Sequence, residues 1–277
     1  MKQISLIVCV FVCLVLFSST SFAQTDTQGV SQEDYEEFVE DLQVWKFTSS
    51  ITYETGDYGT STRATTVYIP FTWTRYFEIG NVSGTLPFIY QKSGPGVTAF
   101  SGRPLRSSNR RGGTRDDQGL GDVLLKGSYY ILKEDTQSLN ADVIGQIKFP
   151  TADDERGLGS GEFDETVGLE TSKNLDELWL VFGDLYYTFI GEPTGLRLNN
   201  ELAFNLGVGY KLSEPTLISL AFEQRTALVD DQDYPRDLIV GLNHKIDEEL
   251  SFNCSADVGL SDGSPDFGAT AGIGYKF

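Results

Sequence analysis

Apolar and polar side chains alternate strictly along the last eleven residues of the chain, 267–277. The apolar face carries Phe267, Ala269, Ala271, Ile273, Tyr275 and Phe277, and the other face carries small, hydroxyl or charged residues. Side chains on a strand have a period of two, and about 10 residues are enough to cross a bilayer when the strand is tilted. The pattern therefore predicts a membrane-spanning β-strand that ends on an aromatic residue.

The same alternation recurs upstream and predicts an all-β fold, a transmembrane antiparallel up-and-down β-barrel of about twelve strands. The predicted strands are 43–54, 60–73, 76–91, 119–132, 137–150, 162–173, 177–190, 196–211, 216–228, 236–246, 250–260 and 266–277. Connections after the even-numbered strands are short, whereas 92–118 and 151–161 are long, as in outer-membrane barrels with short periplasmic turns and long outer loops. An even number of strands places both termini on the periplasmic side. Ten or fourteen strands also fit the pattern, and Pro87 predicts a bulge in the third strand.

Charged residues on the predicted strands fall mostly on the polar face. A Lys or Arg that faces lipid at mid-depth costs about 2–4 kcal/mol, so the charged face is expected to line the lumen. The lumen-lining candidates are Asp122, Lys126, Asp142, Lys148, Glu170, Asp184, Glu201, Glu223 and Arg225. The net charge of the chain is −19. Two interpretations stay open: an open, weakly cation-preferring channel, and a lumen that is closed by ion pairs across it.

The three tryptophans fall at predicted periplasmic strand ends. Trp45, Trp73 and Trp179 are joined there by Tyr76, Tyr130, Tyr210 and Tyr275. Aromatic side chains gather at the water–lipid interface of membrane proteins. This aromatic girdle favours a membrane barrel over a soluble β-sandwich, which has no reason to collect its tryptophans at one level.

The N-terminal segment differs from the rest of the chain. Lys2, the apolar run 4–17 and the small residues that end at Ala23 predict a secretory signal peptide over residues 1–23. Residues 24–42 form an acidic, helix-patterned periplasmic lead-in, or a small helix across the periplasmic mouth, and the barrel occupies 43–277.

No other run is apolar enough for a membrane helix. An acidic chain repels nucleic acid, so we expect no nucleic-acid partner.

The sequence shows no pattern of residues that is typical of a catalytic site or of a cofactor site. The single histidine, His244, has Ile246 two residues later, where a barrel hydrolase would carry its serine. We therefore expect no enzyme activity and no catalytic residues. No Cys and His cluster predicts a metal site, and the glycine-rich stretch 157–161 does not precede a helix, so it predicts no phosphate site. We expect no cofactor.

The connection 92–118 carries five arginines, Arg103, Arg106, Arg110, Arg111 and Arg115. Guanidinium groups bind phosphate groups in a bidentate manner. The loop is therefore a candidate either to fold inward and constrict the pore or to meet the phosphates of lipopolysaccharide. A solvated loop without either role is the third interpretation.

Five short motifs follow one another in a recognisable order. They are 71–78, Leu86-Pro87-Phe88, Gly119-Leu120-Gly121-Asp122, Lys148-Phe149-Pro150-Thr151 and Leu158-Gly159-Ser160-Gly161. Over roughly residues 60–277 the chain resembles the outer-membrane barrel family named for the meta-pathway of phenol degradation. The resemblance implies uptake of aromatic or other hydrophobic compounds. The family tends to have Thr-Gly-Asp where this chain has Thr151-Ala152-Asp153, so no ligand-binding residue is carried over.

The terminal Phe277 resembles the C-terminal signal of bacterial outer-membrane barrels, which implies recognition by the barrel-assembly machinery. The expected location is the bacterial outer membrane, and the expected partners are its lipid, lipopolysaccharide and a small-molecule solute. The first functional hypothesis is a channel or transporter for small molecules, including hydrophobic or aromatic ones. The alternative is a closed barrel with a structural or surface-interaction role.

Overall fold

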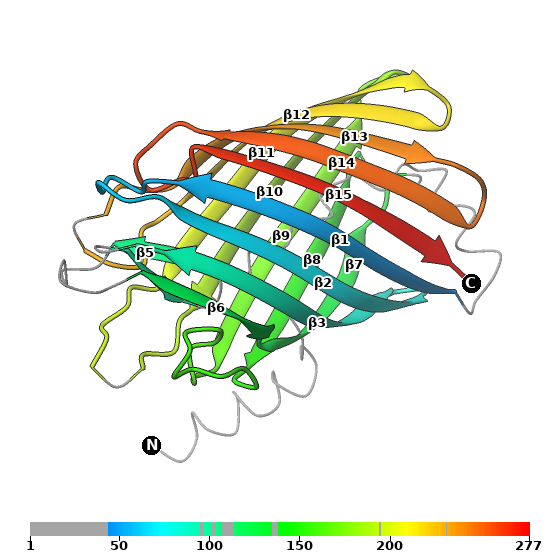
Figure 1. The fold of residues 1–277 in the computed structure, drawn as a ribbon. Helices are drawn as coiled ribbons and strands as arrows, with labels where there is room; N and C mark the ends of the chain where they lie inside the picture. The colour runs from blue at the N-terminus through cyan, green and yellow to red at the C-terminus, as the bar shows by residue number, and fades with distance from the viewer. Residues whose placement is uncertain are drawn as a thin grey trace, which may run out of the picture.

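The fold is a closed barrel of tilted antiparallel strands (Figure 1). The structure, a computed structural model, describes residues 44–94, 97–100, 103–106, 114–134, 138–193, 195–230 and 232–277. The strands are β1 (Trp45–Gly56), β2 (Ala64–Phe77), β3 (Gly80–Ser93), β4 (Val97–Phe100), β5 (Arg103–Arg106), β6 (Arg115–Leu120), β7 (Val123–Leu132), β8 (Asn140–Phe149), β9 (Asp164–Asn174), β10 (Trp179–Phe189), β11 (Glu201–Ser213), β12 (Thr216–Arg225), β13 (Arg236–Lys245), β14 (Leu250–Gly259) and β15 (Phe267–Lys276). No helix long and apolar enough to cross a membrane occurs in the described ranges.

The barrel closes where β1 pairs with β15, from Lys46 opposite Lys276 to Thr55 opposite Phe267. Each strand pairs with its sequence neighbours, apart from β4 and β5, which form a separate hairpin. Because β6 and β7 both pair with β3, one after the other, they act as a single interrupted strand, and the barrel has twelve strands. The predicted up-and-down barrel of twelve strands is confirmed, and the predicted N-terminal helical segment lies outside the described residues.

Two ends of the barrel are distinguished below. The terminal end holds Trp45 and Lys276, near the two termini of the barrel, and the loop end is opposite. The β4–β5 hairpin extends at the loop end, within the connection 92–118, for which the alternation pattern predicts a loop (Figure 1). Two other predicted strand starts are wrong: β11 begins at Glu201 instead of residue 196, and the interrupted strand begins at Arg115 instead of residue 119. β2 and β3 also begin four residues later than predicted, so the turn between them lies at 78–79 instead of 74–75.

The irregularity expected beside Pro87 lies on the neighbouring strand. Leu120 is opposite Phe88 and Leu124 is opposite Thr85, so residues 121–123 face only 86–87. This is the two-against-one arrangement of a β-bulge, extended by one residue. Proline has no N–H to donate, but its carbonyl accepts a hydrogen bond from the Gly121 N–H at 2.9 Å. The bulge turns Asp122 toward the interior, where only 4% of it is exposed.

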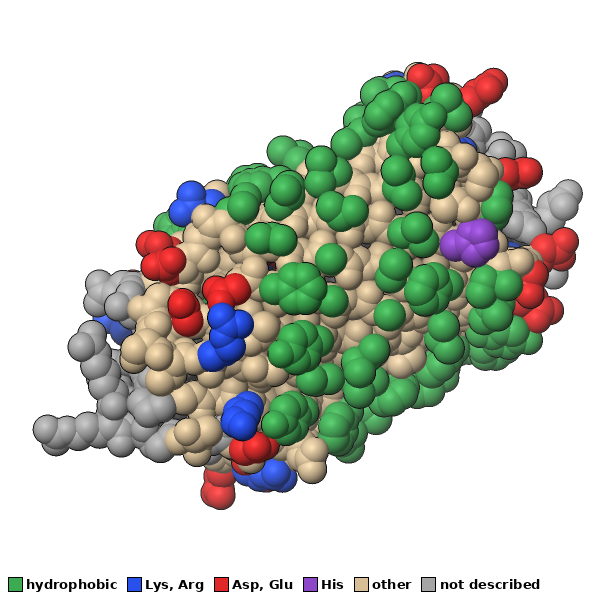
Figure 2. Space-filling view, turned by 45° about the horizontal axis from the view of Figure 1, so that its top comes forward, with side chains coloured by type: hydrophobic (Ala, Val, Ile, Leu, Met, Phe, Trp, Pro, Cys, Tyr) green, Lys and Arg blue, Asp and Glu red, His purple; other side chains and the backbone are tan. Residues whose placement is uncertain are grey.

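On the face drawn in Figure 2, hydrophobic side chains are spread over the barrel between its two ends, and charged side chains gather toward the ends. Along β10, for example, Leu185 and Tyr187 are exposed whereas Asp184 and Thr188 are buried. A single-layer wall with this alternation has one face for lipid and one for the interior. The apolar positions predicted from the sequence as the lipid-facing set therefore lie on the outside.

An arginine in place of Leu206, an exposed residue in the middle of β11, is expected to destabilise the barrel by about 2–4 kcal/mol in a bilayer. The cost arises because the guanidinium would lie at mid-depth in lipid. The matched control is Leu212→Arg near the terminal end of the same strand, where we expect about 0–1 kcal/mol. Equilibrium unfolding in phospholipid vesicles measures both, and an equal cost at the two positions would contradict the assignment of Leu206 to the lipid.

The aromatic girdle is present at the terminal end, with one correction. The three tryptophans are exposed there, and the ring of Trp179 lies 4.8 Å from that of Tyr210. Tyr76 and Tyr130, however, lie on the inner face: Tyr76 shares its face with the buried Tyr68, and the hydroxyl of Tyr130 accepts a hydrogen bond from Asn81 at 3.2 Å. Next to Tyr130 in the sequence, Tyr129 is the exposed tyrosine on the outer face.

Candidate functional site

The connection between β8 and β9, residues 150–163, folds into the barrel and is called the inner loop below. Leu158 is 1% exposed and packs against Tyr68 and Ile89, which are directly opposite each other on β2 and β3. Tyr68 is also opposite Thr52 of β1, a buried residue on the inner face. Since these partners face inward, Leu158 lies inside the barrel.

Hydrogen bonds to the backbone hold the inner loop against the wall. The side-chain amide of Gln91 donates to the carbonyls of Arg156 at 3.2 Å and Gly157 at 3.0 Å. Asp122 Oδ1 accepts from the N–H groups of Thr151 and Ala152, both at 3.0 Å. The bulge beside Pro87 thus supplies the carboxylate that fixes the start of the loop.

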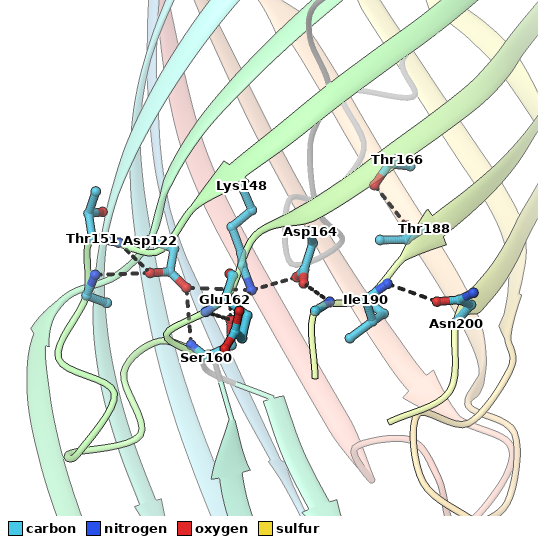
Figure 3. A network of polar contacts seen from close by, with 12 residues as sticks. Asp122, Lys148, Thr151, Ser160, Glu162, Asp164, Thr166, Thr188, Ile190 and Asn200 are labelled. Atoms are coloured by element: carbon cyan, nitrogen blue, oxygen red, sulfur yellow. Dashed lines mark hydrogen bonds and ion pairs between the residues drawn. The ribbon is translucent and has the colours of Figure 1, made fainter. Parts of the chain in front are cut away.

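A buried lysine completes the attachment (Figure 3). Lys148 Nζ lies 2.6 Å from Asp164 Oδ2 and 3.7 Å from Asp122 Oδ2, and it donates to Ser160 Oγ at 2.6 Å. All three charged side chains are almost fully buried, and Asp164 Oδ1 also accepts from the N–H of Gly191 at 2.9 Å. One ammonium therefore holds two carboxylates from different strands and one hydroxyl from the loop, an arrangement called the Lys148 cluster below.

The glycine-rich stretch 157–161 has a conformational explanation. Gly157 and Gly161 both have φ of 71°, in the left-handed region that favours glycine. A Cβ atom on Gly159 would lie 2.7 Å from Asp122 Oδ1. These glycines let the loop turn sharply and approach the Lys148 cluster closely. The glycine-rich stretch is therefore the sequence signal of a tightly folded loop, and not of the phosphate site that was considered for it.

Five acidic residues and one asparagine form a row on the inner face through six consecutive strands. Asp142 is opposite Glu170, Glu170 is opposite Asp184, and the row continues through Asn205, Glu223 and Asp237 on β11, β12 and β13. This row is called the acidic ladder below. Two cations contact it: Lys126 Nζ lies 2.9 Å from Glu170, and Arg225 lies 3.0 Å from Glu223 and 3.6 Å from Asp237.

The nine lumen-lining candidates are all described, and each is buried or half-buried. The structure brings them together in two groups. Asp122 and Lys148 belong to the Lys148 cluster, and Lys126, Asp142, Glu170, Asp184, Glu223 and Arg225 belong to the acidic ladder or pair with it. Glu201 is opposite Thr188, and its charge interacts with that of Arg225.

Two members of these groups, Asp164 and Asp237, were not selected from the sequence. Each lies at the start of its strand, where the alternation pattern is too short to assign a face. Asp164 is 5% exposed and Asp237 is also 5% exposed. The register of the structure identifies both, because Asp164 is opposite Lys148 and Asp237 is opposite Glu223.

The arginine-rich connection is only partly described. Arg103 and Arg106 belong to β5, where they pair with Phe100 and Val97, and Arg115 begins β6. Arg110 and Arg111 lie outside the described residues. A role of these five arginines in constriction or in lipopolysaccharide binding stays a prediction. Among the described residues, the inner loop lies inside the barrel.

His244 contacts a hydroxyl group on the neighbouring strand. Its Nδ1 lies 2.9 Å from the hydroxyl of Thr216, directly opposite on β12. It shares the outer face of β13 with the exposed residues Leu238 and Val240. Within the described ranges, no group of three or more His, Cys, Asp and Glu side chains could hold a metal ion.

The closed barrel, its apolar outer face, its charged inner face and its aromatic girdle together define the class of the protein, a twelve-stranded outer-membrane β-barrel. The chain belongs to the family described as "Putative MetA-pathway of phenol degradation", whose model matches residues 25–277. No curated protein matches the sequence.

Two solved structures illustrate the similarity of fold. An outer membrane channel from Pseudomonas putida F1 superposes with a TM-score of 0.68 at 12% identity, over 86% of this chain and 96% of that chain. The KdgM porin in complex with disordered oligogalacturonate gives a TM-score of 0.50 at 9% identity, over 84% of this chain and 99% of that chain. The first of these proteins is described as a channel and the second as a porin.

Proposed function

We propose that this protein is a non-enzymatic outer-membrane channel for small molecules, narrowed by the inner loop. The observation that carries the proposal is the acidic ladder: its charged groups extend across six strands of the inner face, although charge in a tightly packed interior is costly. Glu170 and Glu223 keep 23% and 20% of their side-chain surface accessible, so water reaches them. A water-filled interior of this kind is the environment of a channel.

The family description supports aromatic or other hydrophobic compounds among the solutes. A neutral aromatic molecule can pass between the charged groups and contact the apolar side chains beside them. The fold similarity to a channel and to a porin is compatible with this use of the barrel.

A closed barrel with a structural or surface-interaction role is the second candidate. The Lys148 cluster and the apolar packing of Leu158 favour it, because they hold the inner loop firmly inside the barrel. The two candidates differ in whether a continuous path remains beside the loop.

Single-channel conductance separates the two candidates. The mature chain, refolded in detergent and added to a planar bilayer, is expected to give steady current steps. A heat-denatured sample of the same protein serves as the control. Folded and inserted protein that passes no current would contradict the channel and favour the closed barrel.

The remaining assignments are part of the same proposal. Signal-peptide cleavage after Ala23 would leave an acidic lead-in before the barrel, and the arginine-rich connection would meet lipopolysaccharide or constrict the pore. The barrel-assembly machinery would recognise Phe277, which is 60% exposed and whose N–H and carbonyl both bond to Trp45 at 2.8 Å. These contacts leave the aromatic ring accessible at the terminal end.

A further inference from the structure

The acidic ladder runs from one end of the barrel to the other. Asp142 is the third residue of β8, which begins at the terminal end, and Asp184 is near the middle of β10. Asp237 is the second residue of β13, which begins at the loop end. Residues directly opposite each other follow a line perpendicular to the strands, and because the strands are tilted this line rises along the barrel axis. The ladder is therefore a continuous track through the barrel wall's inner face.

The charges along this track are unbalanced. Like charges directly opposite each other on neighbouring strands are destabilising. Lys126 and Arg225 contact Glu170, Glu223 and Asp237, whereas Asp142 accepts a hydrogen bond from Ser128 at 3.4 Å and Asp184 from Asn205 at 3.4 Å. Five acidic side chains thus lie along the ladder, and two cations contact it. Such an arrangement concentrates mobile cations and repels anions.

A second row, apolar in character, lies directly beside the acidic one. Phe182, Gly207, Ala221 and Ile239 are opposite one another on β10 to β13, two residues nearer the terminal end than Asp184, Asn205, Glu223 and Asp237. Phe182 and Ala221 are buried together with Leu180, and Ile239 packs against them. Gly207 is needed in this row, because a Cβ atom there would overlap the ring of Phe182. The inner face therefore presents a carboxylate row and an apolar row side by side.

A buried side-chain amide without partners independently indicates that a polar molecule enters the interior. Gln146 is 3% exposed, and neither its Oε1 nor its Nε2 has a hydrogen-bond partner among the described residues. It lies directly opposite Lys126, the cation that contacts the ladder, and two residues from Lys148. A buried amide without partners costs about 1–3 kcal/mol. A polar molecule that passes between the inner loop and the ladder would satisfy it.

We propose that the ladder and the apolar row beside it determine selectivity, and that the channel favours small organic cations whose ammonium group is attached to an aromatic or aliphatic group. The proposal rests on the proposed channel function. The ammonium group passes from carboxylate to carboxylate, while its apolar substituent contacts Phe182, Ala221 and Ile239. Organic anions are disfavoured by the same ladder.

Reversal potentials across a planar bilayer test this proposal. The first measurement uses a KCl gradient, and the second compares 2-phenylethylammonium with benzoate, which share the ring and differ in the sign of their charge. The test variant is Asp142→Asn/Asp184→Asn, which replaces two acidic side chains of the ladder with amides of the same size. The matched control is Glu177→Gln/Glu248→Gln, which removes two charges from exposed turns at the terminal end.

For the native protein and the control, potassium is expected to be more permeant than chloride, and 2-phenylethylammonium more permeant than benzoate, by about threefold or more. In the ladder variant both ratios are expected to fall toward one. A conducting native channel that prefers anions, or a ladder variant with unchanged ratios, would overturn this proposal and leave the channel function in place. Folded, inserted protein without conductance would overturn both.

Discussion

Replacement of Lys148 by methionine is expected to cost about 3–5 kcal/mol of unfolding free energy and to release the inner loop. Removal of one partner from a buried ion pair leaves an uncompensated buried charge. Here two such charges would remain, because the ammonium holds both Asp164 at 2.6 Å and Asp122 at 3.7 Å. Ser160 would also lose the donor to its hydroxyl oxygen. We expect larger current steps from the variant, since the loop would leave the interior.

The control for this prediction is the triple variant Asp122→Asn/Lys148→Met/Asp164→Asn. It removes all three charges, and we expect it to regain much of the stability lost by Lys148→Met, because neutral groups are cheaper to bury than unpaired charges. Equilibrium unfolding in vesicles gives the free energies, and single-channel recording gives the conductance. A Lys148→Met protein as stable as the native one, with unchanged current steps, would show that the cluster does not hold the loop.

The barrel itself could be predicted from the sequence because its determinants are local. A strand exposed to lipid on one face and to water on the other must alternate, and β15 shows the pattern in its own residues. Local alternation also assigned the lumen candidates to the face that the structure buries. The girdle prediction was wrong at Tyr76 and Tyr130, because each was assigned from its place near a strand end, whereas the alternation along its strand places it on the inner face. Trp73, three residues before Tyr76, has the opposite parity and does face outward.

The inner loop could not be predicted in this way, because its contacts are distant in sequence. Leu158 packs on Tyr68 and Ile89, which lie on β2 and β3. Asp122 lies in the bulge between β6 and β7, and both β7 and β8 separate it from the inner loop in the sequence. The arginine-rich connection was the candidate for a constriction, beside lipopolysaccharide binding and a solvated loop, because its charge is visible in the sequence. The register of the acidic ladder could not be predicted for a related reason. The face on which a side chain lies depends only on whether its position in the strand is odd or even, whereas the residue opposite it on the next strand depends on the length of the turn between the strands.

Leu158→Asp is expected to produce the second largest effect, a loss of about 2–5 kcal/mol with release of the inner loop from the wall. Leu158 is 1% exposed, and its side chain joins the loop to Tyr68 and Ile89. A carboxylate at this position would lose that apolar contact and would have to be buried without a cation. The loop would then leave the interior, although the Lys148 cluster would remain chemically intact.

Leu158→Met is the matched control, because a change of shape at nearly constant volume usually costs less than about 1.5 kcal/mol. Unfolding in vesicles and single-channel recording apply to both variants. The comparison with Lys148→Met shows whether the apolar contact of Leu158 or the Lys148 cluster holds the inner loop in the barrel. If Leu158→Asp enlarges the current steps as much as Lys148→Met does, the loop is held cooperatively by its tip and its base. If Leu158→Asp leaves the steps unchanged while Lys148→Met enlarges them, the ion cluster at the base holds the constriction by itself, and the apolar contact at the tip contributes stability alone.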